Sequence, residues 1–298
     1  MKKYSLIILL VGAASVATAQ QLQVTSFPEL QAMFYNPSTA GLGQKLALGA
    51  TYRSQWAGTS GAPRTATVYG SVDLPEKKIG LGGYIFNDKT GATSRTGIQL
   101  AFAKHIPVSN DAKFSLGIEA RAFQFSIDGG KLAENLGNDP VLNSSDNKFK
   151  FDAGFGISFT NKNFQIGASV SQLIQSKLNF YSGGQTPTEE GKLYRHYYLH
   201  GMYKWNIDGV TTVSPSFLMV YLPNAPTEFQ GGIRVEHNET FWWGLGARIR
   251  QGLIASAGLH INKKFKIGYG FEIYKTPYSG FEKGSNAHEI LLGYSLAK

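Results

Sequence analysis

The sequence FWWGLGARIRQGLIASAGLHINKKFKIGYGFEIY, residues 241–274, decides the fold class of this chain. Apolar side chains recur there at every second position, beginning with Phe241, Trp243 and Leu245, and the positions between them are mostly glycine or charged. A period of two is typical of extended strands that have one apolar face. Tight links divide the stretch into three such strands, which predicts an antiparallel meander.

The same alternation extends along most of the chain and predicts fourteen strands. Their expected ranges are 46–55, 64–74, 77–87, 94–106, 113–127, 149–160, 164–174, 193–205, 212–222, 228–237, 241–250, 253–261, 264–274 and 288–296. Every second link is short, and the other set contains all the long ones, 57–63, 88–93, 128–148, 175–192 and 275–287. A soluble sandwich gives no reason for such sorting, whereas an outer-membrane barrel has short periplasmic turns and longer outer loops. We therefore expect an all-β, transmembrane antiparallel β-barrel of about fourteen strands, with both termini on the periplasmic side.

Charged residues fall mainly on the strand parity opposite to the apolar one. A charge on the lipid face costs about 2–4 kcal/mol at mid-bilayer, so these side chains must face inward, where the glycines leave room for long arginines or for a plug. Arg234, Arg248 and Arg250 are expected to form an inward basic ladder, either as a salt-bridged lumen wall or as an anion-selective constriction or plug-docking surface. Aromatic residues near strand ends are expected at the membrane interfaces. They include Tyr35, Tyr52, Trp56, Tyr84, Phe86, Tyr203, Trp205, Trp242, Trp243 and Tyr274.

The first residues predict export. Two lysines precede a short apolar run, and an A-x-A cleavage site ends at Ala19, which together indicate a signal peptide. Its cleavage lowers the formal net charge from +9 to +7, because it holds two lysines and no acid. The expected organisation is a signal peptide at 1–19, an irregular plug or periplasmic segment at 20–44 and a barrel in the outer membrane of a Gram-negative cell at 45–298.

The sequence offers no pattern for a catalytic, cofactor or metal site. It lacks the G-x-S-x-G, H-E-x-x-H and P-loop spacings. His196 and His200 lie four residues apart, which on a strand separates them by about 13 Å, too far to share a metal ion. The basic residues are scattered at strand spacing, so the positive charge favours anionic lipid or an acidic partner over nucleic acid.

Three motifs follow one another near the N-terminus. They are Tyr35-Asn36-Pro37-Ser38-Thr39-Ala40-Gly41, Tyr52-Arg53-Ser54-Gln55-Trp56 and Gly61-Ala62-Pro63-Arg64-Thr65. Their order and spacing resemble the N-terminal pattern of the PorP/SprF family of Bacteroidota membrane proteins, and the stretches 80–91 and 288–294 resemble later family features. Ser38-Thr39 departs from the family, which usually has an alanine after the proline.

The resemblance implies an outer-membrane barrel of the type IX secretion system and, in gliding species, a role in surface adhesin display. It also implies partners, namely a secreted cargo protein with a C-terminal sorting domain and the periplasmic ring or lipoprotein components. Beside this, the candidate contacts with a partner or a plug are Asn36, Pro37, Ala40, Gly41, Tyr52, Arg53, Gln55, Trp56, Pro63 and Thr65. We expect a non-enzymatic secretion accessory; a passive or substrate-selective channel and a lipid-active barrel enzyme stay open as alternatives.

Overall fold

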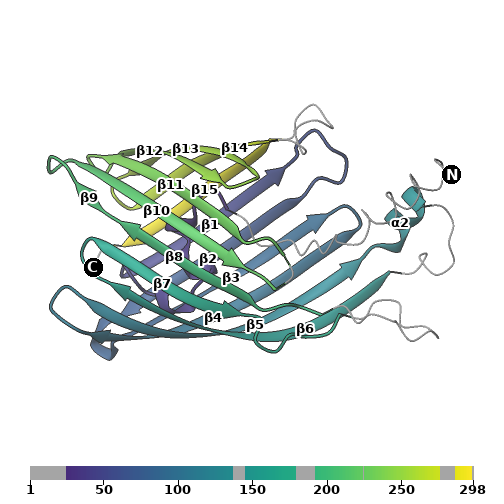
Figure 1. The fold of residues 1–298 in the computed structure, drawn as a ribbon, viewed down its shortest axis with the longest axis horizontal. Coiled ribbons are helices and arrows are strands. Elements are labelled where there is room, and N and C mark those ends of the chain that lie inside the picture. Colours follow the sequence, from purple (N-terminus) through teal and green to yellow (C-terminus); the bar gives the residue numbers. More distant parts are fainter. Residues whose placement is uncertain (1–24, 137–144, 179–191, 224, 276–285, 297–298) are drawn as a thin grey trace, which may run out of the picture.

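The computed structural model describes residues 25–136, 145–178, 192–223, 225–275 and 286–296, and most of them belong to one cylindrical sheet (Figure 1). Its strands are β1 Leu46–Gln55, β2 Arg64–Leu74, β3 Ile79–Thr90, β4 Thr93–Pro107, β5 Lys113–Ile127, β6 Asp146–Thr160, β7 Phe164–Ser171, β8 His196–Tyr203, β9 Trp205–Asn206, β10 Thr211–Tyr221, β11 Glu228–His237, β12 Phe241–Arg248, β13 Gly252–Ile261, β14 Phe265–Tyr274 and β15 Ala287–Leu296. The bounds expected for β1, β2, β5 and β11 agree with the structure, and the other strands differ from expectation at one or both ends.

The sheet closes into a barrel of fourteen strands, as the alternation predicts. β8 and β9 form one position in the wall, because both pair with β10 and only Lys204 separates them. Every neighbour pair is antiparallel, and the wall closes through the pairing of β10 with β11 and of β1 with β15. Closure gives each strand two neighbours and so removes the free edges that a membrane does not tolerate.

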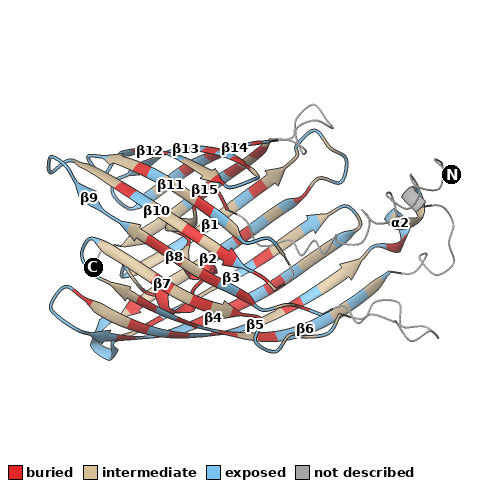
Figure 2. Cartoon of the chain, viewed as in Figure 1, coloured by how far each residue is buried: buried red, intermediate tan, exposed pale blue. Residues whose placement is uncertain are grey.

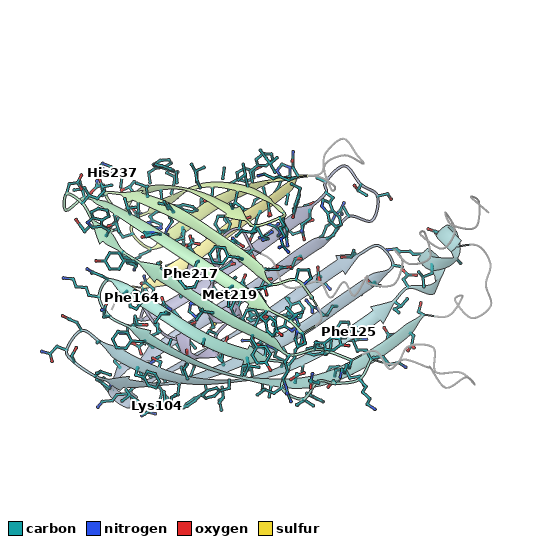
Figure 3. All side chains as sticks on the ribbon, in the orientation of Figure 1. Lys104, Phe125, Phe164, Phe217, Met219 and His237 are labelled. Carbon is teal, nitrogen blue, oxygen red and sulfur yellow. The ribbon has the colours of Figure 1, made fainter. Side chains whose placement is uncertain are left out.

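Large apolar side chains cover the outer face of the wall. Val68, Leu100 and Leu245 expose 62%, 60% and 61% of their surface, while residues of the opposite parity are largely buried. Figure 2 shows the resulting alternation of buried and exposed bands along the strands, and Figure 3 shows side chains projecting from both surfaces of the wall. Lipid therefore solvates the apolar parity, and the interior takes the polar one.

The two rims of the barrel differ in their links. Lys104 lies near the rim of short turns and Phe125 toward the rim of long loops, which we call the short-turn rim and the long-loop rim (Figure 3). The link at 128–145 carries a short helix, α2 Gly129–Leu136. Within the described ranges, no helix has the length and apolar character needed to cross a membrane.

The link expected at 88–93 is wrong, because β3 and β4 continue into it. The two strands pair as far as Thr90 and Thr93 and leave a two-residue turn. Contacts across this extension hold it: Asn87 Nδ2 donates to Thr96 Oγ1 over 2.6 Å, and the Arg95 guanidinium lies 5.1 Å from the ring centre of Phe86. With fifteen residues each, β4, β5 and β6 carry this side of the wall outward at the long-loop rim (Figure 1).

The segment 25–45 lies inside the barrel. It contains three single turns of 3-10 helix, η1 Pro28–Leu30, η2 Ala32–Phe34 and η3 Pro37–Thr39. Thr25 bonds to residues near the long-loop ends of β11, β12 and β15, whereas the backbone N–H of Lys45 donates to Leu296 O at the short-turn rim. The segment thus crosses the lumen, and the described chain begins toward the long-loop rim. The N-terminus, expected on the periplasmic side, lies outside the described residues. The predicted signal peptide lies outside the described residues.

Several aromatic residues expected at the membrane interfaces lie in the lumen instead. Trp242 is fully buried, with its ring edge-on to Phe27 at 5.9 Å. The interior of a wide barrel needs large side chains, and the parity of these residues directs them there. The others buried are Tyr35, Tyr84, Phe86 and Tyr274, whereas Tyr52, Tyr203, Trp205 and Trp243 are exposed on the outer side.

The outward parity makes a prediction for lipid-facing charge. Ile118→Arg, at mid-strand on the outer face of β5, is expected to lower the free energy of unfolding by about 2–4 kcal/mol. Gln124→Arg, on the same face nearer the long-loop rim, is expected to cost about 0–1 kcal/mol. Urea unfolding of the barrel in lipid vesicles, followed by tryptophan fluorescence, measures both values. Equal costs at the two positions would contradict this placement of the bilayer.

Candidate functional site

The side chain of Asn36 joins the middle of the segment 25–45 to the wall of the barrel. It is fully buried and caps η3, because its Oδ1 accepts from Ser38 N over 3.0 Å and from Ser38 Oγ over 2.7 Å. These donors fix the orientation of the amide, so its Nδ2 is a donor toward Ile157 O at 2.9 Å and toward His200 Nε2 at 3.0 Å. The ring nitrogen of His200 therefore accepts a hydrogen bond here. A single amide joins the segment to β6 and β8 of the wall.

Small residues of the wall make room for this part of the segment. A Cβ on Gly156 would overlap the Asn36 amide, one on Gly117 would overlap the backbone of Ser38, and one on Gly80 would overlap Ala40 O. The wall also binds the segment through hydroxyl groups. Ser169 Oγ donates to Tyr35 O over 2.6 Å, and Gly41 N donates to Ser71 Oγ over 2.6 Å. The predicted motif 36–41 is therefore a lumen contact of the barrel with its own chain.

Aromatic side chains pack against one another on the long-loop side of this amide. The Phe34 ring lies 4.6 Å from that of Tyr84 and 5.3 Å from that of Tyr69, and the Tyr35 ring lies 5.6 Å from that of Tyr198. All but Tyr69 belong to one buried apolar cluster, against which Tyr69 packs. Rings at these separations attract one another beyond the area that they bury.

A buried ion cluster holds the start of the segment. Arg53 donates to Glu289 Oε2 over 3.1 Å and also binds Glu272, and Arg248 Nη1 donates to Glu272 Oε1 over 2.6 Å. These four side chains expose 4% or less of their surface. The resulting order, Arg248–Glu272–Arg53–Glu289, alternates in charge and runs across β12, β14, β1 and β15.

The ion cluster binds the segment directly. Thr25 Oγ1 and Ser26 N each donate to a Glu289 oxygen over 2.6 Å, and Arg53 Nη1 donates to Ser26 Oγ over 2.9 Å. The second carboxylate oxygen of Glu289 thus serves both the chain and the arginine. Because charged hydrogen bonds in a buried site are strong, this contact anchors the segment at the long-loop half of the lumen.

The other candidate residues divide between the lumen and the outside. Arg234 lies 3.8 Å from Glu29 and 3.7 Å from Glu236, apart from the pairs of Arg248. Arg250 does not join a ladder, because β12 ends at Arg248 and Arg250 lies in an exposed turn with a φ of 67°. The expected three-arginine ladder is thus wrong, and the two remaining arginines have carboxylate partners.

Around β1, most of the candidate residues contact the barrel itself. Gln55 Nε2 donates to Tyr274 OH over 2.7 Å, the Trp56 ring lies 6.4 Å from that of Tyr274, and Thr65 Oγ1 donates to Asp88 over 2.9 Å. Pro63 is fully buried. Tyr52 is 47% exposed on the outer face and makes no lumen contact. Sequence reasoning missed Glu289 as an anchor, although its position on the inward parity of β15 was a signal.

One serine and histidine pair lies in the lumen. Ser115 Oγ is 2.8 Å from His105 Nδ1, but both side chains expose 2% or less of their surface. A substrate therefore has no access to this hydroxyl. Among the described residues, no three histidine, aspartate or glutamate side chains gather as a metal site.

The lumen is not filled completely at the short-turn rim. A cavity of about 400 Å³ lies there between the segment at 29–34, the turn at 161–163 and the walls of β8 and β14. Three lysines, Lys162, Lys204 and Lys266, are among the residues that line it.

These features define a class, an antiparallel membrane barrel whose lumen is occupied by its own N-terminal segment. Residues 16–294 match the family described as type IX secretion system membrane protein PorP/SprF. The chain belongs to this family, and with its barrel it is an outer-membrane protein of type IX secretion.

Two solved structures are similar to this chain at low sequence identity. The CymD monoaromatic hydrocarbon channel gives a TM-score of 0.50 with 10% identity, over 93% of this chain and 94% of that one. Omp33 of Acinetobacter baumannii gives 0.49 with 8% identity, over 86% of this chain and all of that one. Likeness at such identity concerns the fold alone. No curated protein matches the sequence.

The ion cluster makes a prediction for stability. Arg53→Ala leaves the carboxylates of Glu272 and Glu289 buried with one partner fewer, so we expect a loss of about 3–5 kcal/mol in the free energy of unfolding. Arg64→Ala, at the exposed start of β2, is the control and is expected to change it by about 0.5 kcal/mol or less. Urea unfolding in detergent micelles measures both. A cost for Arg53→Ala no larger than that of the control would show that the cluster does not anchor the fold.

Proposed function

We propose that this barrel is a non-enzymatic accessory of type IX secretion that binds protein partners at its rims and does not conduct solutes through its lumen. The observation that carries the proposal is the N-terminal segment in the lumen, with Asn36, Ser38 and Ala40 buried against the wall. The segment is costly to displace, because buried groups such as the Asn36 amide and the Ser38 hydroxyl would lose their hydrogen-bond partners.

The lumen contacts argue against the channel alternative. A solute would have to pass both the aromatic packing of Phe34 and Tyr35 and the ion cluster around Arg53. Of the arginines expected to form a selective constriction, Arg248 is paired with Glu272, and Arg234 lies near Glu29 and Glu236. Arg250 lies outside the lumen in an exposed turn. A constriction that selects anions needs cationic groups free to meet the ion.

The rims are the surfaces left for partners. The long-loop rim would face the cell exterior and meet the C-terminal sorting domain of a secreted cargo protein, which the barrel would hold or help to display. The short-turn rim would face the periplasmic ring or lipoprotein components of the system. Family membership supports association with the secretion machinery, and the sorting of link lengths supports this assignment of sides.

The closed lumen makes a prediction for conductance. The purified wild-type barrel is expected to show no steady conductance in a planar bilayer. Gly117→Ala is expected to open conducting events, because its Cβ would overlap the backbone of Ser38 and push the segment off the wall. Gly293→Ala is the matched control, since its Cβ would meet only ordinary contacts from 3.4 Å outward. Steady, ion-selective conductance of the wild-type protein would support the channel alternative instead.

Partner binding is tested by capture. The full-length barrel in detergent is expected to retain a secreted cargo protein carrying its sorting domain, and to lose it when that domain is deleted. A variant in which glycine and serine replace the link 57–63 tests the long-loop rim. If this rim binds the cargo protein, the variant is expected to retain less of it. Retention that does not depend on the sorting domain would contradict a dedicated cargo role.

A further inference from the structure

The cavity at the short-turn rim carries an excess of positive charge. Lys162, Lys204 and Lys266 line it, and the only carboxylate in its lining is that of Glu29, whose Oε1 lies 3.8 Å from Arg234 Nε. In the described part of the chain, no hydrogen bond or ion pair reaches the ammonium group of any of the three lysines. Arg234 and Lys204 act on Lys266 as like charges, whereas Glu236 and Glu29 act on it as opposite charges.

The lining of the cavity is otherwise mixed. Amide side chains, Gln44, Asn161 and Gln165, stand on it together with apolar ones, Met33, Leu42 and Met202. Carboxylates of a ligand would find cations there, a ligand backbone would find amide donors and acceptors, and aliphatic side chains would find apolar surface. This combination is the one that an extended peptide requires.

We propose that this cavity, at the mouth of the barrel beneath the N-terminal segment, binds an acidic, partly apolar segment of a periplasmic protein partner through Lys204 and Lys266. The inference rests on the proposed secretion role and deepens it, because it assigns a site on the periplasmic side. The carboxylates of the partner would add negative charge to the cavity, and they would attract the ammonium groups of Lys204 and Lys266.

Position and size favour a peptide over the other anions of this compartment. The cavity lies inside the ring of strands, where β1, β2, β7, β8, β14 and β15 surround it, whereas lipid head groups lie outside that ring. Its volume of about 400 Å³ is more than ten times the roughly 30 Å³ that one water occupies in the liquid. A lone phosphate would leave most of it unfilled.

The test measures binding of a defined probe to the full-length barrel in detergent. The probe is a short fluorescein-labelled peptide of alternating glutamate and leucine, and the readout is fluorescence anisotropy at low salt. The variant with Lys204→Gln and Lys266→Gln is expected to bind it about tenfold more weakly than the wild type. The control with Lys104→Gln and Lys264→Gln, on the same rim but outside the cavity, is expected to match the wild type. Unfolding in urea confirms that both variants keep the fold.

Three outcomes would overturn the inference. The first is that the wild type and the Lys204→Gln, Lys266→Gln variant bind the peptide with equal affinity. The second is that the control loses as much affinity as this variant, which would show that only the general surface charge matters. The third is displacement of the peptide by inorganic phosphate as effective as by unlabelled peptide, which would indicate a simple anion site. Failure of peptide binding while cargo capture persists would overturn this inference alone. Failure of capture while the peptide binds would count against the cargo role alone.

Discussion

A cylinder of fourteen strands encloses more space than the side chains of its own wall can fill, and this constraint governs the interior of the protein. The chain meets it with its own N-terminal segment. Glycines such as Gly117 and Gly156 thin the wall where that segment lies against it, and the Asn36 amide and nearby serines give its polar groups their partners. Buried polar groups need such partners, so the wall and the segment have matching chemistry.

The charged part of the interior gives specificity more than net stability. Buried ion pairs often contribute little compared with apolar packing, because both charges lose their water, but a charge left alone is expensive. Arg53 has two carboxylate partners, and Glu289 also accepts from Thr25 and Ser26. A segment shifted by one residue would leave these groups unmatched. The cluster therefore fixes one position of the segment along the lumen.

Much of the wall could be predicted from the sequence. Because one face of each strand contacts lipid, apolar residues occur at every second position of the strand. The inward parity of Arg53 was predictable for the same reason, but its partner Glu289 lies 236 residues away and meets it only when the barrel closes. The aromatic residues show the limit more clearly. Both Trp242 and Tyr84 were expected at the membrane interfaces, yet their strand parity directs them into the lumen, and Tyr84 lies in the middle of β3. Arg250 failed as a lumen residue because its strand ends two positions earlier, a boundary that alternation does not determine.

The place of the ion cluster in the wall has a consequence for biogenesis. β1 and β15, the first and last strands, meet at the seam that completes the cylinder, and Arg53 reaches from β1 to Glu289 on β15 and Glu272 on β14. Thr25 and Ser26 are bonded to that same junction. During insertion, Thr25 and Ser26 can therefore reach Glu289 only once β15 has taken its place in the sheet. Binding of the segment and closure of the barrel are therefore coupled, because both use Arg53 and Glu289.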